Sequence, residues 1–270
     1  MNARDYLTSS DSDLVIARCV AFTALWICVR WVASNVVFSN VEPALRVRQG
    51  TKSVIVVHSA FQAVAAVWLV SYDPVVAPLL REVASRPASL DLANVNSPGV
   101  TFLATVAAGE FTCQMLHLYY WYEKKSDLIM VAHHTFSALI WPLGVAAHRS
   151  QFFIANMLFY EISTPFMALL HFFKDWKTTY ALLGTLFTLS FVLVRLVTVP
   201  VTLYFYYLTW DTWIVNSPTA KPWVGPFCMA LEKIFVPLPI LMNIYWGKLV
   251  VSGYLKAVLG KDKNKAKKAK

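Results

Sequence analysis

The segment Val131–Pro142 reads VAHHTFSALIWP and places two adjacent histidines, His133 and His134, among apolar side chains. The solvent around this segment decides how the whole chain folds. Of the 270 residues, 57% are hydrophobic and 14% are charged, whereas roughly a quarter of the residues in an ordinary soluble domain are charged. The composition therefore predicts an integral membrane protein.

Transmembrane helices are expected wherever about 20 weakly charged residues run together, the length that crosses roughly 30 Å of hydrocarbon. Seven runs meet this expectation, at 14–38, 53–72, 99–121, 127–147, 151–173, 178–207 and 227–250. The first has an acidic flank and is too long for a secretory signal, so we expect it to remain in the protein. The predicted fold is all-α, with about seven transmembrane helices bundled around a central, lipid-sized cavity.

Basic residues in the short loops predict the orientation of these helices. They follow the first, third and fifth spans, at Arg46, Arg48, Lys52, Lys124, Lys125, Lys174 and Lys177. The positive-inside rule places these loops and the C-terminus in the cytosol, and residues 1–13 in the lumen. In the luminal loop 73–98, residues 76–84 either form a short interfacial helix or have no regular structure.

The C-terminal residues 256–270 are expected to be a disordered, lysine-rich cytosolic tail. The last four are Lys267-Lys268-Ala269-Lys270, which resemble the di-lysine signal that coat proteins recognise on endoplasmic reticulum membrane proteins. Contact with anionic lipid is the alternative for such a tail. A nucleic-acid partner is not expected, because the net charge of +9 comes mostly from this tail.

Polar side chains recur at helical spacing inside the predicted spans. Glu110, Gln114 and His117 stand at i, i+4 and i+7 of one span, and His58 and Gln62 stand at i and i+4 of another. Ionisable groups in hydrocarbon are costly and need partners or a water-lined cavity. We therefore expect a shared polar interior near the cytosolic ends, lined by His58, Glu110, Gln114, His117, Ser163, Thr164, His171, Arg195 and Asn243.

Two other interpretations of these polar residues stay open. Each could instead form an interhelical hydrogen bond worth around 1 kcal/mol. Zinc needs three or four N, S or O ligands, and nothing in the spacing selects a metal over a general base. No metal or other cofactor is therefore predicted. The four cysteines form no C-x-x-C pair and are interpreted as small apolar packing residues: Cys19, Cys28, Cys113 and Cys228.

Five short motifs between about residues 45 and 255 together resemble the TLC-domain family, which includes the ceramide synthases and several smaller lipid-homeostasis proteins. They are Gly109-Glu110-Phe111, His133-His134, Glu161-Ile162-Ser163-Thr164-Pro165-Phe166, Phe191 to Arg195, and Met242-Asn243-Ile244-Tyr245-Trp246. The second carboxylate of the ceramide synthase signature is absent after Glu161. The resemblance is therefore closer to the smaller members.

The resemblance implies an endoplasmic reticulum protein that binds a lipid or acyl chain and influences membrane lipid composition. The alternative is an N-acyltransferase that uses acyl-CoA and an amine such as a sphingolipid base. In that case His133 or His134 would be the base, Glu161 would orient it, and Arg195 or Asn243 would stabilise the oxyanion. A further alternative is a cargo factor that cycles between endoplasmic reticulum and Golgi, which only Lys267 and Lys268 support.

Overall fold

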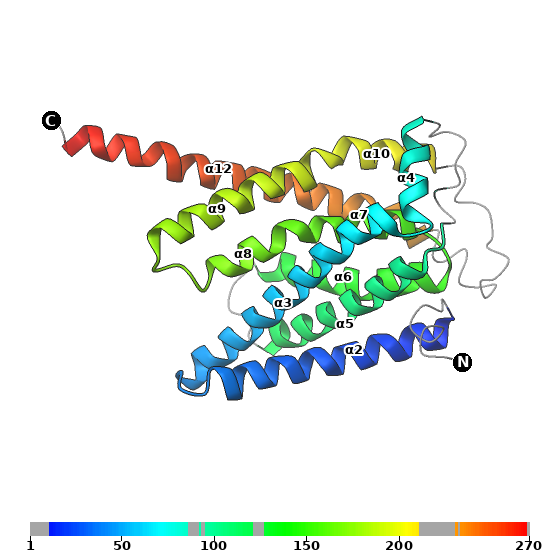
Figure 1. Ribbon diagram of the computed structural model, residues 1–270, viewed down its shortest axis with the longest axis horizontal. Helices are drawn as coiled ribbons and strands as arrows, with labels where there is room; N and C mark the ends of the chain where they lie inside the picture. The colour runs from blue at the N-terminus through cyan, green and yellow to red at the C-terminus, as the bar shows by residue number, and fades with distance from the viewer. Residues whose placement is uncertain are drawn as a thin grey trace.

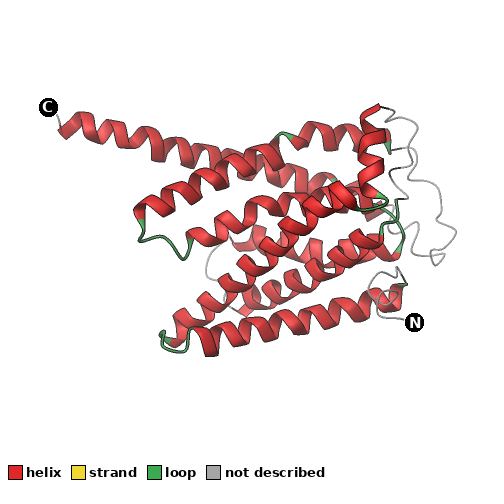
Figure 2. Cartoon of the chain, viewed as in Figure 1, coloured by secondary structure: helices red, strands yellow, loops and turns green. Residues whose placement is uncertain are grey.

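The structure, a computed structural model, describes residues 11–85, 92, 95–120, 127–210, 230–231 and 233–268. All regular elements in these ranges are helical (Figure 2). In chain order they are α2 (Ser12–Val32), η1 (Ala33–Val37), α3 (Pro43–Tyr72), α4 (Val76–Ser85), α5 (Pro98–Tyr120), α6 (Asp127–Ala146), α7 (Gln151–Phe159), η4 (Tyr160–Ser163), α8 (Thr164–Leu170), α9 (Lys177–Phe191), η5 (Val192–Leu196), α10 (Thr198–Leu208) and α12 (Pro237–Lys268). The prediction of an all-α fold is confirmed.

Six of the described helical stretches are long and apolar enough to cross a membrane, against about seven predicted. They are Asp13–Val37, Leu45–Tyr72, Leu128–Ala146, Gln151–Leu170, Lys177–Leu208 and Lys233–Val258. The predicted span that is missing from this set corresponds to α5. That helix packs against α2, α3, α6 and α7, and residues 103–111 are all buried. Because protein surrounds it, α5 tolerates Thr, Gly and Glu in its middle.

The helices of the bundle place the basic loops together. The turn from α2 to α3, the turn from α8 to α9 and the C-terminal end of α12 lie at one end, and the N-terminus lies at the other (Figure 1). We call the first the basic end, because Arg46, Arg48, Lys174 and Lys177 lie there. This arrangement is the one required by the loop charges.

Two close contacts fix α5 within the bundle. A Cβ on Gly109 would lie 2.8 Å from the backbone nitrogen of Thr23 and 2.6 Å from Cβ of Phe22. Only glycine lets α2 approach α5 this closely. The indole Nε1 of Trp26 then donates a hydrogen bond to the Val106 carbonyl at 3.3 Å.

Away from the basic end, a chain of hydrogen bonds ties three loops together. Ser97 Oγ donates to Asp73 Oδ2 at 2.9 Å, and its backbone N–H donates to Gln151 Oε1 at 2.6 Å. Gln151 Nε2 donates to Asn96 Oδ1 at 3.0 Å, and Asn96 Nδ2 donates to His148 Nδ1 at 3.0 Å. Between these loops α4 forms the short helix that was one of two alternatives for 76–84.

The C-terminal part of the chain differs from its prediction. Helix α12 continues to Lys268, whereas a disordered tail was expected from residue 256. Lysine and alanine, which dominate this stretch, are both good helix formers. The end of α12 therefore extends as a helix beyond the other helices (Figure 1).

Candidate functional site

Arg195 is the centre of a polar cluster inside the bundle. Its Nε donates to the Tyr160 carbonyl at 3.1 Å and to Ser163 Oγ at 3.0 Å. Its Nη2 donates to Thr164 Oγ1 at 3.0 Å, and its Nη1 donates to Asn243 Oδ1 at 3.3 Å. One guanidinium therefore joins η5 to η4, α8 and α12.

Among the residues that the structure describes, Glu161 supplies the counter-charge to this guanidinium. Its Oε1 lies 4.0 Å from Arg195 Nη2, and both residues are buried. The Arg195 guanidinium carbon also lies 5.1 Å from the ring centroid of Phe191. The arginine is thus held by hydrogen bonds, an aromatic face and a carboxylate.

Both charged residues lie on helix segments that depart from α geometry, and a proline explains each departure. Pro165 has no N–H to bond the Glu161 carbonyl, which accepts instead from the Thr164 N–H in a 3₁₀ pattern. Pro200 likewise leaves the Leu196 carbonyl without its α-helical donor. The preceding turn is a π-helix in which the Val197 N–H donates to the Val192 carbonyl at 2.9 Å.

A small polar pocket borders this cluster. It has an empty volume of about 330 Å³ and is lined by His133, Ser137, Trp141, Met157, Tyr160, Glu161, Arg195, Pro239, Asn243 and Trp246. The His133 ring packs edge-on against Trp246, with 5.4 Å between ring centroids. The pocket therefore combines an imidazole, a carboxylate, a guanidinium and an amide.

A larger apolar pocket adjoins the polar one. It has an empty volume of about 650 Å³, open space at its mouth included, and shares His133, Ser137, Trp141, Met157 and Pro239 with the polar pocket. The rest of its lining is mostly apolar and comes from α6, α7 and residues 231–242: Phe136, Ile140, Leu143, Gly144, Ser150, Phe153, Ile154, Leu231, Phe235, Val236, Leu238 and Met242. This pocket extends from His133 toward Ser150, away from the basic end. The sequence analysis expected the polar interior near the ends that carry the basic loops.

The two adjacent histidines have different surroundings. His133 lines both pockets. His134 is buried, lines neither pocket, and packs against Phe111 with 5.2 Å between ring centroids. Successive residues on a helix are about 100° apart, which sends the two imidazoles in different directions.

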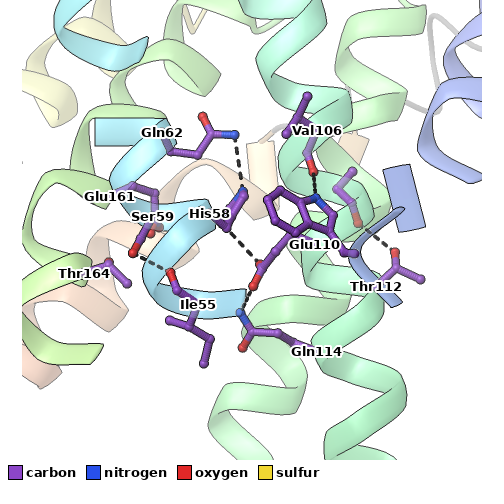
Figure 3. Close-up of polar contacts among 12 residues, drawn as sticks. Ile55, His58, Ser59, Gln62, Val106, Glu110, Thr112, Gln114, Glu161 and Thr164 are labelled. Atoms are coloured by element: carbon purple, nitrogen blue, oxygen red, sulfur yellow. Dashed lines mark hydrogen bonds and ion pairs between the residues drawn. The ribbon is translucent and has the colours of Figure 1, made fainter. Parts of the chain in front are cut away.

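A second polar cluster lies between α3 and α5, and Figure 3 shows it. His58 Nδ1 is 3.4 Å from Glu110 Oε2, and Gln114 Nε2 donates to Glu110 Oε1. On the other side of the ring, Gln62 Nε2 lies 3.3 Å from His58 Nε2. His58, Gln62 and Glu110 are fully buried, and none of the four residues lines either pocket.

The predicted site residues thus separate into two groups and some outliers. Glu161, Arg195, Asn243 and His133 line the polar pocket, with Ser163 and Thr164 bonded behind Arg195. His58, Glu110 and Gln114 form the closed second cluster. His171 follows α8 toward the basic end and joins neither. The side chains of His117, Lys267 and Lys268 lie outside the described residues.

The chemistry available in the polar pocket differs from the predicted one in one respect. Glu161 pairs with Arg195, and no hydrogen bond joins it to His133 in the described part of the chain. Within the same residues, no three His, Cys, Asp or Glu side chains come together in a group that could hold a metal ion. An imidazole beside a neutralised ion pair can bind a polar headgroup or accept a proton.

Ser137 and Tyr160 were missed from the sequence, although both line the polar pocket. Ser137 stands four residues after His133, so the helical period that grouped the other residues could have found it. Tyr160 is the first residue of the 3₁₀ turn η4, and a regular helical period does not describe this turn. Its hydroxyl accepts a hydrogen bond from Asn156 Nδ2 at 3.1 Å.

Comparison with known proteins agrees with this architecture. The sequence model of the TLC domain matches residues 49–252. A relative is TLC domain-containing protein 4 A of Dictyostelium discoideum, 25% identical over 154 residues that cover 54% of this chain and 55% of that protein. The aligned part thus spans about half the length of this curated relative. No solved structure matches.

The TLC-domain match includes all five motifs, from Gly109 to Trp246, and both pockets described above. It supports a role connected with membrane lipids in general terms. Because the match covers well over half of the chain, this multi-pass membrane protein belongs to the TLC-domain family.

Proposed function

We propose that this protein binds one lipid or acyl chain in its joined pockets and thereby influences membrane lipid composition in the endoplasmic reticulum. The observation that carries the proposal is that the polar and the apolar pocket lie side by side and share His133, Ser137 and Trp141 in their linings. Ligand sites for amphipathic molecules combine apolar walls with a few convergent polar groups.

The charges of the polar pocket indicate which headgroup it accepts. Arg195 and Glu161 neutralise each other at 4.0 Å, so the pocket holds no net fixed charge from this pair. A fully charged group would lose its hydration without gaining a free counter-ion. The pocket therefore favours a neutral hydrogen-bonding group, such as a hydroxyl, an amide or an ester.

The experiment fills the apolar pocket while leaving its polar end untouched. Ile140→Trp and Leu238→Trp each put an indole where the chain would lie. The matched controls are Leu139→Trp and Leu241→Trp, whose native side chains are 58% and 61% exposed on the same helices. Native mass spectrometry of each purified protein reports the retained lipid.

The wild type and both controls should retain a lipid that the two pocket variants lose. An empty wild-type protein, or equal retention in all variants, would contradict the proposal. An untargeted lipid comparison of cells with and without the protein then identifies the affected class.

An N-acyltransferase is the second candidate, because His133 lies in the pocket with two possible oxyanion donors, Arg195 and Asn243. The amine nitrogen would attack the thioester carbonyl, His133 would take the amine proton, and the CoA thiolate would leave. In proteoliposomes with acyl-CoA and a long-chain base, His133→Ala should abolish amide formation. His134→Ala should retain it, because His134 lines neither pocket. Absence of product from the wild type removes this candidate.

Retention in the endoplasmic reticulum is proposed from the di-lysine pattern at Lys267 and Lys268. Replacing both residues with serine should release the protein to later compartments. An unchanged location would show that the pattern is not a signal.

A further inference from the structure

The end of the apolar pocket that is remote from His133 carries a hydroxyl group that the proposed function does not use. Ser150 lines the pocket and is 6% exposed. Its Oγ is buried and has no hydrogen-bond partner in the described part of the chain. The other residues that line this end are Leu143, Gly144, Phe153 and Ile154. One unsatisfied hydroxyl is therefore set in an otherwise apolar wall.

The backbone around Ser150 explains why the hydroxyl stays unused. Ser150 is the N-cap residue of α7, a position at which a serine hydroxyl usually accepts a hydrogen bond from the first turn of the helix. Here the residue has a left-handed backbone with φ 58°, and its side chain makes no such bond. The Arg149 N–H donates to the Gly144 carbonyl at 2.8 Å, and the Ile154 N–H donates to the Ser150 carbonyl at 2.9 Å. These bonds hold Ser150 from both sides.

The length of the pocket relates this hydroxyl to the polar pocket at the other end. Cβ of Ser150 lies 3.8 Å from the place that a Cβ on Gly144 would occupy. From His133 to Gly144, helix α6 rises about 16 Å. The hydrocarbon of a bilayer is about 30 Å thick, so the chains of one leaflet extend over about 15 Å. An acyl chain whose headgroup lies in the polar pocket therefore ends near Ser150.

The chemistry of the chain end then decides whether the Ser150 hydroxyl is paired. An ordinary acyl chain ends in a methyl group, which would leave this buried hydroxyl without a partner at a cost in binding free energy. A trapped water is poorly held, because a buried water typically makes about three hydrogen bonds and the side chains at this end offer it Ser150 alone. A hydroxyl at the end of the lipid chain both donates and accepts, so it would satisfy Ser150 directly.

We propose that the joined pockets take a lipid with a polar group at each end: a neutral headgroup beside Arg195 and Asn243, and a terminal hydroxyl on the chain that pairs with Ser150. The inference rests on the proposed lipid binding and narrows its ligand class. Ser150 is then a specificity-determining residue, which selects an ω-hydroxylated acyl chain over an ordinary one.

The test measures how the full chain distinguishes methyl hexadecanoate from methyl ω-hydroxyhexadecanoate, two neutral esters that differ only in the terminal hydroxyl. Each ester is titrated in mixed micelles, and native mass spectrometry counts the bound molecules. Ser150→Gly removes the side chain, and glycine accepts the left-handed backbone without strain. Relative to the wild type, this variant should lose about tenfold of its preference for the hydroxylated ester.

Two further variants separate the hydroxyl from the pocket as a whole. Ser252→Ala is the matched control, because Ser252 donates to the Leu249 carbonyl at 3.2 Å and lines neither pocket. It should keep the wild-type ratio of the two affinities. Ile140→Trp fills the pocket and should weaken both esters alike. If Ser150→Gly does not fold, Ser150→Ala also removes the hydroxyl and should give the same change in the ratio.

The outcomes distinguish this proposal from the proposed function. An equal ratio of affinities in the wild type and Ser150→Gly would overturn the pairing at Ser150. Equal weakening of both esters by Ser150→Gly would place the headgroup at Ser150 and would also overturn it. A wild type that retains its own lipid but takes up neither ester would contradict this proposal alone. A wild type that is empty and takes up neither ester would contradict the proposed function as well.

Discussion

Replacing Arg195 with methionine tests whether the polar pocket is held together by one side chain. Methionine keeps much of the length and the apolar stem but removes four hydrogen bonds and the ion pair with Glu161. The variant leaves the oxygens of Ser163, Thr164 and Asn243 without their donor. It also leaves Glu161 buried without a counter-charge.

The expected magnitude follows from these losses. Interhelical hydrogen bonds in membrane proteins average about 0.6 kcal/mol, so four sum to about 2–3 kcal/mol. Breaking a buried ion pair by removing one partner costs about 3–5 kcal/mol, much of it from the stranded charge. We expect Arg195→Met to lower the free energy of unfolding by about 3–5 kcal/mol.

Unfolding in mixed micelles, titrated with a denaturing detergent, measures this difference. Thr164→Val removes a single acceptor and should cost less than about 1.7 kcal/mol. The double variant Arg195→Met, Glu161→Gln should recover part of the stability, because no charge is then stranded. A loss below about 1 kcal/mol for Arg195→Met, or no recovery in the double variant, would refute the reasoning.

Three further predictions concern other parts of the bundle. Gly109→Ala should lower the free energy of unfolding by about 1–3 kcal/mol in the same assay, because the added methyl overlaps the backbone of α2. The control Gly184→Ala, whose methyl meets nothing within 4 Å, should raise it by up to about 1 kcal/mol. A larger loss for Gly184→Ala than for Gly109→Ala would contradict the close approach of α2 and α5. Glu110→Ala should cost about 1–3 kcal/mol, because it removes the partner of His58 Nδ1 and of Gln114 Nε2, and a neutral effect would show that the second cluster is not structural. Burial lowers the pKa of His148 from its ordinary value of 6.5, so as the pH falls the unfolded chain takes up this proton before the folded chain does. The contribution of His148 to stability should therefore be full above pH 6.5 and decrease below it. His148→Gln should flatten this pH dependence in the same unfolding assay.

The sequence predicts the membrane class and most spans because both depend on local apolar content. Where neighbouring protein replaces lipid, that signal weakens. Residues 103–111 of α5 are buried on every side, and this helix, although 23 residues long, is not apolar enough to count as a membrane span. Its position at the centre follows from packing at Gly109, which a hydropathy pattern does not register.

The spacing of polar residues predicts which side chains share a face of one helix but not which neighbour that face meets. His58 and Gln62 were correctly placed on one side of α3, and Glu110 and Gln114 on one side of α5. The two sides turned out to meet each other in a closed cluster. The rotation of each helix about its own axis depends on contacts far apart in the sequence, so a single common chamber could not be distinguished from two separate clusters.

Irregular helix geometry explains why His171 lies apart from the other residues predicted to line the polar interior. Glu161, Thr164 and His171 fall on one face only if every residue turns the chain by about 100°. The 3₁₀ turn at Tyr160–Ser163 advances by about 120° per residue, and α8 ends at Leu170. Thr164 remains with the Arg195 cluster, whereas His171 is carried toward α3. The prolines at 165 and 200 are visible in the sequence, and each lies four to five residues after a charged residue of the pocket. In these two helices proline therefore marks the turn that carries a buried charge, because the freed carbonyl and the altered pitch both require polar neighbours.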